Sequence, residues 1–242
     1  MMGVNIQKEK WNDIPYLVYE GDAPERLIFV QHGIYGNKEK SMSLMGVPLA
    51  DAGYTVVATD ARMHGARGEY PFIEKTPPIG GMTMPHIIHP TAQDIIDLFE
   101  AKFPQYERFD YLGISMGGII GYHLLTLTDR VDQFYGVITT PDYQSLIDMA
   151  PESRKEEYPE MAENAQTKMR ALNPALRFDE MHYGAIKMFH GTQDDVVPIG
   201  GVQAFYDAHK SAHVSLEIFD TDHHITKPMM AAIMAHTKAA LK

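Results

Sequence analysis

The stretch of sequence that decides the fold is Phe109-Asp110-Tyr111-Leu112-Gly113-Ile114-Ser115-Met116-Gly117-Gly118. Its first six residues are mostly apolar and lead into a glycine-containing turn, which is typical of a buried parallel strand. The residues from Met116 to Leu127 carry a helical pattern. The sequence therefore places Ser115 on a tight turn that joins a strand to a helix.

Glycines flank this serine at the second position on either side, so the turn has the form G-x-S-x-G. Small neighbours are needed because the turn is tight. Such a turn lifts the serine hydroxyl clear of the sheet, beside a helix N-terminus where negative charge is favoured. The same three positions also fit a glycine-rich turn with a capping serine. The strand before the turn and the helix after it favour the first interpretation, in which Ser115 is a nucleophile.

Short apolar runs of the same character recur along the chain, and helical patterns lie between the later ones. The further strands expected are Arg26–Gln31, Tyr54–Thr59, Phe134–Thr139, Ile186–His190 and Val214–Phe219, after an N-terminal hairpin of Val4–Lys10 and Ile14–Tyr19. The further helices expected are Lys40–Ala52, Thr91–Phe103, Gly201–His209 and Thr226–Leu241. Strands that alternate with helices predict an α/β fold, with a mostly parallel eight-stranded sheet covered by helices on both faces.

Two stretches interrupt this alternation. Tyr70–Pro90 contains five prolines and two adjacent glycines, which predicts a long loop. Asp142–His182 is more polar and partly helical, and it occupies a place where a single crossover helix would suffice. We interpret it as a small helical lid, about residues 142–182, inserted into a single domain that spans residues 1–242.

A histidine-glycine pair begins the loop after the first of the central strands, in His32-Gly33-Ile34-Tyr35-Gly36. Acyl transfer develops an oxyanion, and backbone N–H groups must be in place to bind it. In this architecture one donor follows the nucleophile and the other comes from this loop. We therefore assign the oxyanion hole to the N–H groups of Ile34 and Met116, although an ordinary strand-to-helix turn has the same composition. His32 is expected to brace the loop rather than to act as a base.

Candidates for the acid and the base follow the last two expected strands. Asp194 or Asp195 can orient an imidazole across the top of the sheet, with an Asx turn that caps the next helix as the alternative. His223 or His224 follows the final strand, and a neutral imidazole can accept a serine proton near neutral pH. The chain order of serine, aspartate and histidine suits this architecture. Asp142 is a second candidate for the acid.

Composition excludes several classes of function. The chain has 242 residues, a formal net charge of −11 and a sequence pI near 5.5. Neutralising phosphates needs clustered Lys and Arg, so nucleic acid and anionic membranes are not expected as partners. The absence of cysteine excludes disulfides, thiolate metal sites and a cysteine nucleophile. No signal-peptide core and no run of about 18 apolar residues is visible, which leaves the cytoplasm as the expected compartment.

Three histidines outside these motifs could suggest a metal site. His86 and His89 lie three residues apart in the proline-rich stretch and His64 lies upstream, but no clear carboxylate partner accompanies them. We therefore expect no metal and no other cofactor. Arg62 and Arg67 lie on either side of Gly65 and are expected to brace the loop over the site, with recognition of an acidic substrate as the alternative.

Five segments together resemble the α/β-hydrolase superfamily, and most closely the small bacterial esterases near its dienelactone-hydrolase and prolyl-oligopeptidase branches. These segments are His32-Gly33, Asp60–Gly65, Gly113–Gly118, Gly191–Pro198 and Asp222–Thr226. The resemblance extends from about residue 14 to the C-terminus and is weakest through the stretch interpreted as a lid.

The resemblance decides between the neighbouring candidates. In such esterases the motif G-x-x-D-x-x-V-P carries the acid at its first aspartate, which falls on Asp194. The base of a pattern like G-H-x-V-T falls on His223, with Asp222 in place of the glycine. Dienelactone hydrolases use a cysteine nucleophile, so Ser115 argues against that activity. Prolyl oligopeptidases carry a β-propeller for which this chain has no room, so peptidase specificity is not implied.

These residues predict a cofactor-independent serine esterase that cleaves small carboxylic esters through an acyl-enzyme, with Ser115, Asp194 and His223 as catalytic residues. A serine peptidase or amidase, or an acyltransferase, would use the same three residues. A non-catalytic homologue would keep the pocket for a ligand and lose the chemistry. Likeness of fold alone does not select the substrate, and the oligomeric state is left open.

Overall fold

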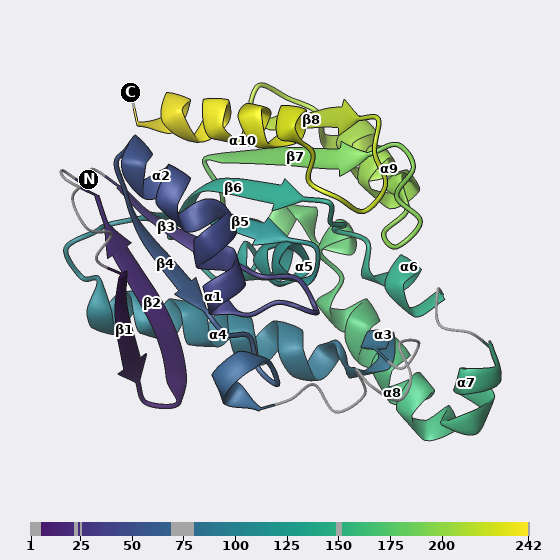
Figure 1. The fold of residues 1–242 in the computed structure, drawn as a ribbon. Coiled ribbons are helices and arrows are strands. Elements are labelled where there is room, and N and C mark those ends of the chain that lie inside the picture. The colour runs from purple at the N-terminus through teal and green to yellow at the C-terminus, as the bar shows by residue number, and fades with distance from the viewer. Residues whose placement is uncertain (1–5, 22–23, 25, 69–79, 149–151, 242) are drawn as a thin grey trace.

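A single eight-stranded sheet forms the centre of the protein (Figure 1). The structure is a computed structural model that describes residues 6–21, 24, 26–68, 80–148 and 152–241. The strands are β1 (Ile6–Trp11), β2 (Ile14–Glu20), β3 (Arg26–Gln31), β4 (Tyr54–Thr59), β5 (Phe109–Ile114), β6 (Val131–Val137), β7 (Ala185–Gly191) and β8 (Val214–Phe219). They are ordered β1-β2-β4-β3-β5-β6-β7-β8. Strand β2 pairs antiparallel with β1 and β4, and the other neighbouring pairs are parallel, which confirms the predicted fold class.

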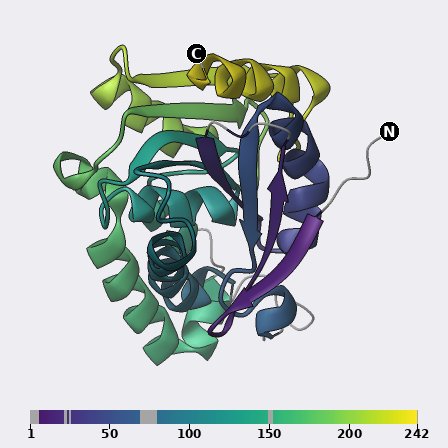
Figure 2. The same ribbon diagram turned by 90° about the vertical axis from the view of Figure 1, so that its left-hand side faces the viewer.

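Helices cover both faces of this sheet (Figure 2). They are α1 (Lys38–Ser41), the π-helical turn η1 (Met42–Gly46), α2 (Val47–Ala52), the 3₁₀ turn η2 (Gly65–Arg67), α3 (Gly80–Thr83), α4 (Pro85–Lys102), α5 (Met116–Leu124), α6 (Tyr143–Asp148), α7 (Glu152–Glu157), α8 (Pro159–Leu172), the 3₁₀ turns η4 (Pro174–Leu176) and η5 (Phe178–Glu180), α9 (Ile199–His209) and α10 (Lys227–Ala240). One apolar cluster joins the sheet to α4, α5 and α9, and a second joins its other face to η1, α2 and α10.

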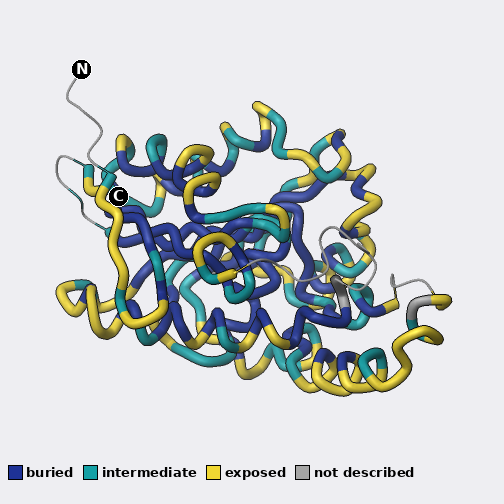
Figure 3. Tube along the Cα trace, turned by 60° about the horizontal axis from the view of Figure 1, so that its bottom comes forward, coloured by how far each residue is buried: buried dark blue, intermediate teal, exposed yellow. Residues whose placement is uncertain are grey.

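The central strands carry apolar side chains toward both faces of the sheet because both faces are buried. In β3, Phe29 belongs to the cluster shared with α4 and α5, whereas Ile28 and Val30 belong to the cluster on the opposite face. Successive side chains of a strand point to opposite faces, so two covered faces demand a continuous apolar run. Figure 3 shows this pattern as a buried interior with exposed residues along the outer helices and turns.

The predicted loop Tyr70–Pro90 is wrong at its C-terminal end. Residues 69–79 lie outside the described residues, but α3 occupies Gly80–Thr83 and α4 begins at Pro85, so Pro90 lies inside a helix. A proline inside a helix costs about 3 kcal/mol, because it removes a backbone hydrogen bond and crowds the preceding turn. Ile87 and Ile88 are both completely buried, and burying one such side chain stabilises by about 1.5–3 kcal/mol. Apolar burial thus outweighs the local rule against proline.

The end of β6 also differs from the prediction. The apolar run Phe134–Thr139 predicts a strand through Thr139, but β6 ends at Val137. Ile138 has a φ of 44°, a left-handed conformation that β-branched residues rarely adopt. Its N–H donates to the carbonyl oxygen of Phe189 at 2.8 Å, so a contact with β7 holds the chain in this conformation. The strand therefore stops and the next residues turn toward the serine at the end of β5.

The segment interpreted as a lid contains α6, α7, α8, η4 and η5. It leaves the sheet after β6 and returns at β7, on the side of the molecule to which the parallel strands point (Figure 1). Tyr143 and Met169 are completely buried and belong to the main apolar cluster, so the segment is attached to the body of the protein through apolar side chains. Helix α8 contacts α3, α4 and α6.

Candidate active site

Ser115 lies between β5 and α5 in a strained backbone conformation, with φ 52° and ψ −117°. A β-carbon at Gly113 would lie 2.4 Å from the carbonyl oxygen of Gly117, and one at Gly117 would lie 2.3 Å from the carbonyl oxygen of Gln31. Only glycine therefore fits on either side of the turn. The hydroxyl of Thr139 donates to the carbonyl oxygen of Ser115 at 2.8 Å, which helps to hold the strained peptide.

His223 lies between Ser115 and Asp194, which come from the ends of three different strands. Its Nε2 is 3.0 Å from Ser115 Oγ, and its Nδ1 is 2.7 Å from Asp194 Oδ2. An ionised carboxylate can only accept, so the proton of a neutral imidazole belongs on Nδ1. Nε2 is then free to accept the proton of the serine hydroxyl. The structure thus brings together the three side chains predicted as catalytic.

The loop after β7 fixes the direction of Asp194 with its own backbone. Oδ1 of Asp194 accepts the N–H groups of Val196 at 3.1 Å and Val197 at 2.8 Å, while Oδ2 faces His223. The side chain is completely buried, so this charge is screened little by water. Asp195, the other candidate in this loop, is exposed. The Asx turn considered for this loop is therefore present and uses Oδ1 of Asp194. The other carboxylate oxygen, Oδ2, contacts Nδ1 of His223.

The other candidates for the acid and the base lie outside this constellation. Asp142 accepts the N–H of Gln144 at 3.1 Å, which is the role of a cap at the start of α6. His224 points to solvent, with 79% of its side chain exposed, and its Nδ1 lies 2.6 Å from Asp222. Neither residue has a contact of this kind with Ser115.

The two N–H groups predicted as oxyanion donors lie on segments that meet at Ser115. A β-carbon built at Gly33 would lie 3.8 Å from Ser115 Oγ, so the backbone of the loop after β3 passes beside the hydroxyl. The carbonyl oxygen of Gly33 accepts the N–H of Gly36 at 2.8 Å, which fixes the peptide that carries the N–H of Ile34. Met116 is the first residue of α5, and the first N–H groups of a helix have no partner within it.

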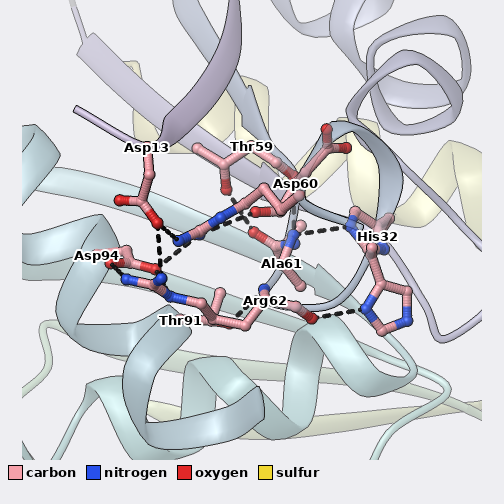
Figure 4. A network of polar contacts seen from close by, with 11 residues as sticks. Asp13, His32, Thr59, Asp60, Ala61, Arg62, Thr91 and Asp94 are labelled. Carbon is pink, nitrogen blue, oxygen red and sulfur yellow. Dashed lines mark hydrogen bonds and ion pairs between the residues drawn. The ribbon is translucent and has the colours of Figure 1, made fainter. Parts of the chain in front are cut away.

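His32 braces this loop, as predicted. The N–H of Ala61 donates to its Nε2 at 3.0 Å (Figure 4), so the ring proton is on Nδ1, which donates to the carbonyl oxygen of Gly33 at 2.7 Å. Burial lowers the pKa of His32 to about 4, so the imidazole is neutral near pH 7. Both ring nitrogens are engaged with backbone, which leaves His32 no part as a base.

A family model described as the alpha/beta hydrolase fold matches residues 26–171 of this chain. The chain belongs to the α/β-hydrolase family. Its sequence is also similar to "Putative esterase YitV" from Bacillus subtilis (strain 168). The two are 24% identical over 223 residues, which cover 86% of this chain and 85% of that protein.

Solved structures share the fold of this α/β hydrolase over nearly its whole length. TT1662 from Thermus thermophilus superposes with a TM-score of 0.83 at 20% identity, covering 100% of this chain and 99% of the other. Acetyl xylan esterase 1 from Thermoanaerobacterium sp. JW/SL YS485 superposes with a TM-score of 0.69 at 17% identity, covering 98% and 87% of the two chains. At these identities the likeness establishes a common fold, and the chemistry must be argued from the site.

Two of the three histidines considered as metal ligands contact other groups in this hydrolase. His89 Nδ1 lies 3.0 Å from His123 Nε2, whereas His64 contacts the carbonyl oxygen of Ile34. In the part of the chain that the structure describes, no three His, Cys, Asp or Glu side chains are grouped so as to hold a metal ion. Among the described helices, none has both the length and the apolar character that crossing a membrane requires.

The two arginines near the site are engaged with carboxylates (Figure 4). Arg62 binds Asp94 of α4 through Nη2 at 2.7 Å and Asp13 of the β1–β2 turn through Nη1 at 2.7 Å. Arg67 binds the same two carboxylates at 2.7 and 3.1 Å. Thr91, expected as the first residue of a helix, lies inside α4, and its hydroxyl accepts the N–H of Arg62 at 3.0 Å. These contacts favour the bracing role over recognition of an acidic substrate.

Proposed function

We propose that this α/β hydrolase is a serine esterase that cleaves small carboxylic esters through an acyl-enzyme. The observation that carries the proposal is the position of His223, with Nε2 3.0 Å from Ser115 Oγ and Nδ1 2.7 Å from Asp194 Oδ2. A nucleophile, a general base and an orienting carboxylate in mutual hydrogen-bond reach are the arrangement that nucleophilic catalysis by serine requires.

In the proposed reaction Ser115 Oγ attacks the ester carbonyl while Nε2 of His223 takes the hydroxyl proton. The N–H groups of Ile34 and Met116 donate to the oxyanion that forms. The intermediate collapses, and His223 returns the proton to the leaving alcohol. Water then attacks the acyl-enzyme with the same base, the carboxylic acid departs, and Ser115 regains its proton. Asp194 stabilises the imidazolium at both stages. These steps need no cofactor.

The names of two relatives support an ester as the substrate. One is a bacterial protein named as an esterase and the other an acetyl xylan esterase. We propose a small, rather apolar ester, with the helices α6, α7 and α8 acting as the lid beside the site. These helices follow β6, on the side of the molecule to which β5 points (Figure 1), and Ser115 comes directly after β5.

Steady-state hydrolysis of p-nitrophenyl acetate and butyrate tests the proposal, with Ser115→Ala as the paired variant. We expect turnover by the wild type and none above background by the variant, whose fold should be unchanged in circular dichroism. Cleavage of the matching p-nitroanilides, and acyl transfer to an added alcohol, should both be slow compared with ester hydrolysis. Fast anilide cleavage would indicate an amidase, and fast acyl transfer an acyltransferase. Retained turnover in Ser115→Ala would refute the nucleophile assignment.

A further inference from the structure

His64 lies in the turn after β4 and contacts the loop that carries Ile34. Its Nε2 is 2.7 Å from the carbonyl oxygen of Ile34, and its Nδ1 is 2.9 Å from the carbonyl oxygen of Arg62. Carbonyl oxygens only accept, so the ring is the donor; a neutral imidazole can donate one of these bonds and an imidazolium both. The residue is 3% exposed, so water competes little for these contacts.

The backbone around His64 adopts an uncommon conformation. Met63 has a φ of 63° and Gly65 a φ of 55°, so left-handed residues flank the histidine on both sides. Such a conformation costs a non-glycine residue about 1–3 kcal/mol and persists only where the surroundings enforce it. A β-carbon at Gly65 would lie 2.3 Å from the carboxylate of Asp60, so no larger residue fits there. Strain of this kind concentrates at functional sites.

Asp60 anchors the end of the loop that carries Ile34. Its Oδ1 accepts the backbone N–H of Lys38 at 2.8 Å, and its Oδ2 accepts Lys38 Nζ at 2.6 Å and the N–H of Ala66 at 2.9 Å. Burial alone would lower the pKa of Lys38, but the hydrogen bond to Asp60 raises it, so the ammonium group of Lys38 stays charged. His32 holds the start of the loop and Asp60 its end, which leaves Ile34 between them, at the place that His64 contacts.

We propose that His64 is a positioning residue that sets the direction of the Ile34 N–H in the oxyanion hole. This inference rests on the proposed esterase function. The N–H and the carbonyl of Ile34 belong to two peptide planes that meet at one α-carbon, so a hydrogen bond to the carbonyl restricts the rotation of both. A donor that is already in place needs no reorganisation when the charge develops. Loss of the contact should therefore weaken transition-state binding more than substrate binding.

Three variants test this role: His64→Leu removes both ring nitrogens, His64→Gln keeps an N–H donor, and His213→Leu is the matched control. His213 also places a ring nitrogen 3.0 Å from a backbone carbonyl oxygen, that of Gly184, but it is exposed and directly precedes the edge strand β8. Removing an oxyanion donor outright costs about 10²–10³ in kcat, so a misdirected one should cost about 10–100-fold. We expect that loss in His64→Leu at nearly constant KM, partial recovery in His64→Gln, and wild-type values in His213→Leu.

Amide hydrogen exchange of residues 32–37 measures the same contact without relying on activity. Exchange in this segment should be faster in His64→Leu than in the wild type, and unchanged in His213→Leu. Equal exchange in all three proteins, or an unchanged kcat in His64→Leu when the wild type is active, would overturn the positioning role. If the wild type has no esterase activity but residues 32–37 still exchange faster in His64→Leu, the esterase proposal is refuted and the contact between His64 and Ile34 remains supported. If His64→Leu does not fold, His64→Gln supports the role with intermediate kcat and exchange, and overturns it with wild-type values of both.

Discussion

Asp194→Asn replaces one carboxylate oxygen by an amide nitrogen, and the surrounding backbone dictates how the new amide must face. Oδ1 of Asp194 accepts the N–H groups of Val196 and Val197 at 3.1 and 2.8 Å. Both partners are donors, so the amide oxygen of asparagine must remain there and the NH₂ group must face His223. His223 must then accept at Nδ1 and carry its proton on Nε2. That proton faces Ser115 Oγ, so the ring can no longer take the serine proton.

Loss of the working tautomer predicts a fall in kcat of about 10⁴, the size of the same substitution in a serine protease triad, or about 5.5 kcal/mol in activation free energy. The substitution is isosteric and keeps both backbone hydrogen bonds, so Tm and KM should change little. The assay is steady-state hydrolysis of p-nitrophenyl butyrate, with thermal unfolding as a check on the fold. Asp195→Asn, in the exposed neighbour, is the matched control. A loss smaller than about tenfold in Asp194→Asn, or equal losses in both variants, would refute the tautomer mechanism.

Three further predictions concern the site and its surroundings. His223→Ala should remove most ester turnover and His224→Ala little, because His224 is exposed; the reverse ranking in kcat would move the base. Thr139→Val loses the hydrogen bond to the carbonyl of Ser115 and should lower kcat by up to about tenfold at constant KM, whereas Thr139→Ser should keep wild-type kcat; equal kcat in the two would contradict this. Burial lowers the pKa of His32 from 6.5 to about 4, so the unfolded chain binds more protons between these values. The free energy of unfolding, measured by urea denaturation, should fall by up to about 3 kcal/mol as pH drops through this window. In His32→Gln this free energy should depend less steeply on pH. An equal pH dependence in the two proteins would contradict the prediction.

Much of the sheet is predictable because a buried parallel strand is a continuous apolar run between turns. Strands β3 and β5 occupy the predicted residues Arg26–Gln31 and Phe109–Ile114. The same rule fails at β6, since nothing in the identity of Ile138 signals a left-handed backbone; the contact with β7 imposes it. Prediction from local propensity fails at Pro90. The proline favours a loop, but the burial of neighbouring isoleucines extends α4 through it.

The order of the motifs predicts which loops meet at the site, but patterns alone do not choose between adjacent residues. Asp194 and Asp195 differ in the direction of their side chains, which depends on backbone hydrogen bonds such as that from Val197. Likeness to known esterases was needed to prefer one of them. The contact between His64 and Ile34 joins residues thirty positions apart on different loops, so no spacing rule could predict it. The signal available in the sequence was a histidine next to a glycine in a turn after a strand.

Nucleophilic attack by Ser115 is tested most directly by intact-protein mass spectrometry after exposure to a fluorophosphonate. The serine oxygen forms a bond to phosphorus as fluoride leaves, so an active nucleophile gains one adduct. We predict a single adduct that peptide mapping assigns to Ser115, loss of ester turnover in proportion to labelling, and no adduct in Ser115→Ala. An unlabelled protein without ester turnover would contradict the esterase proposal and favour a homologue that binds ligands without catalysis.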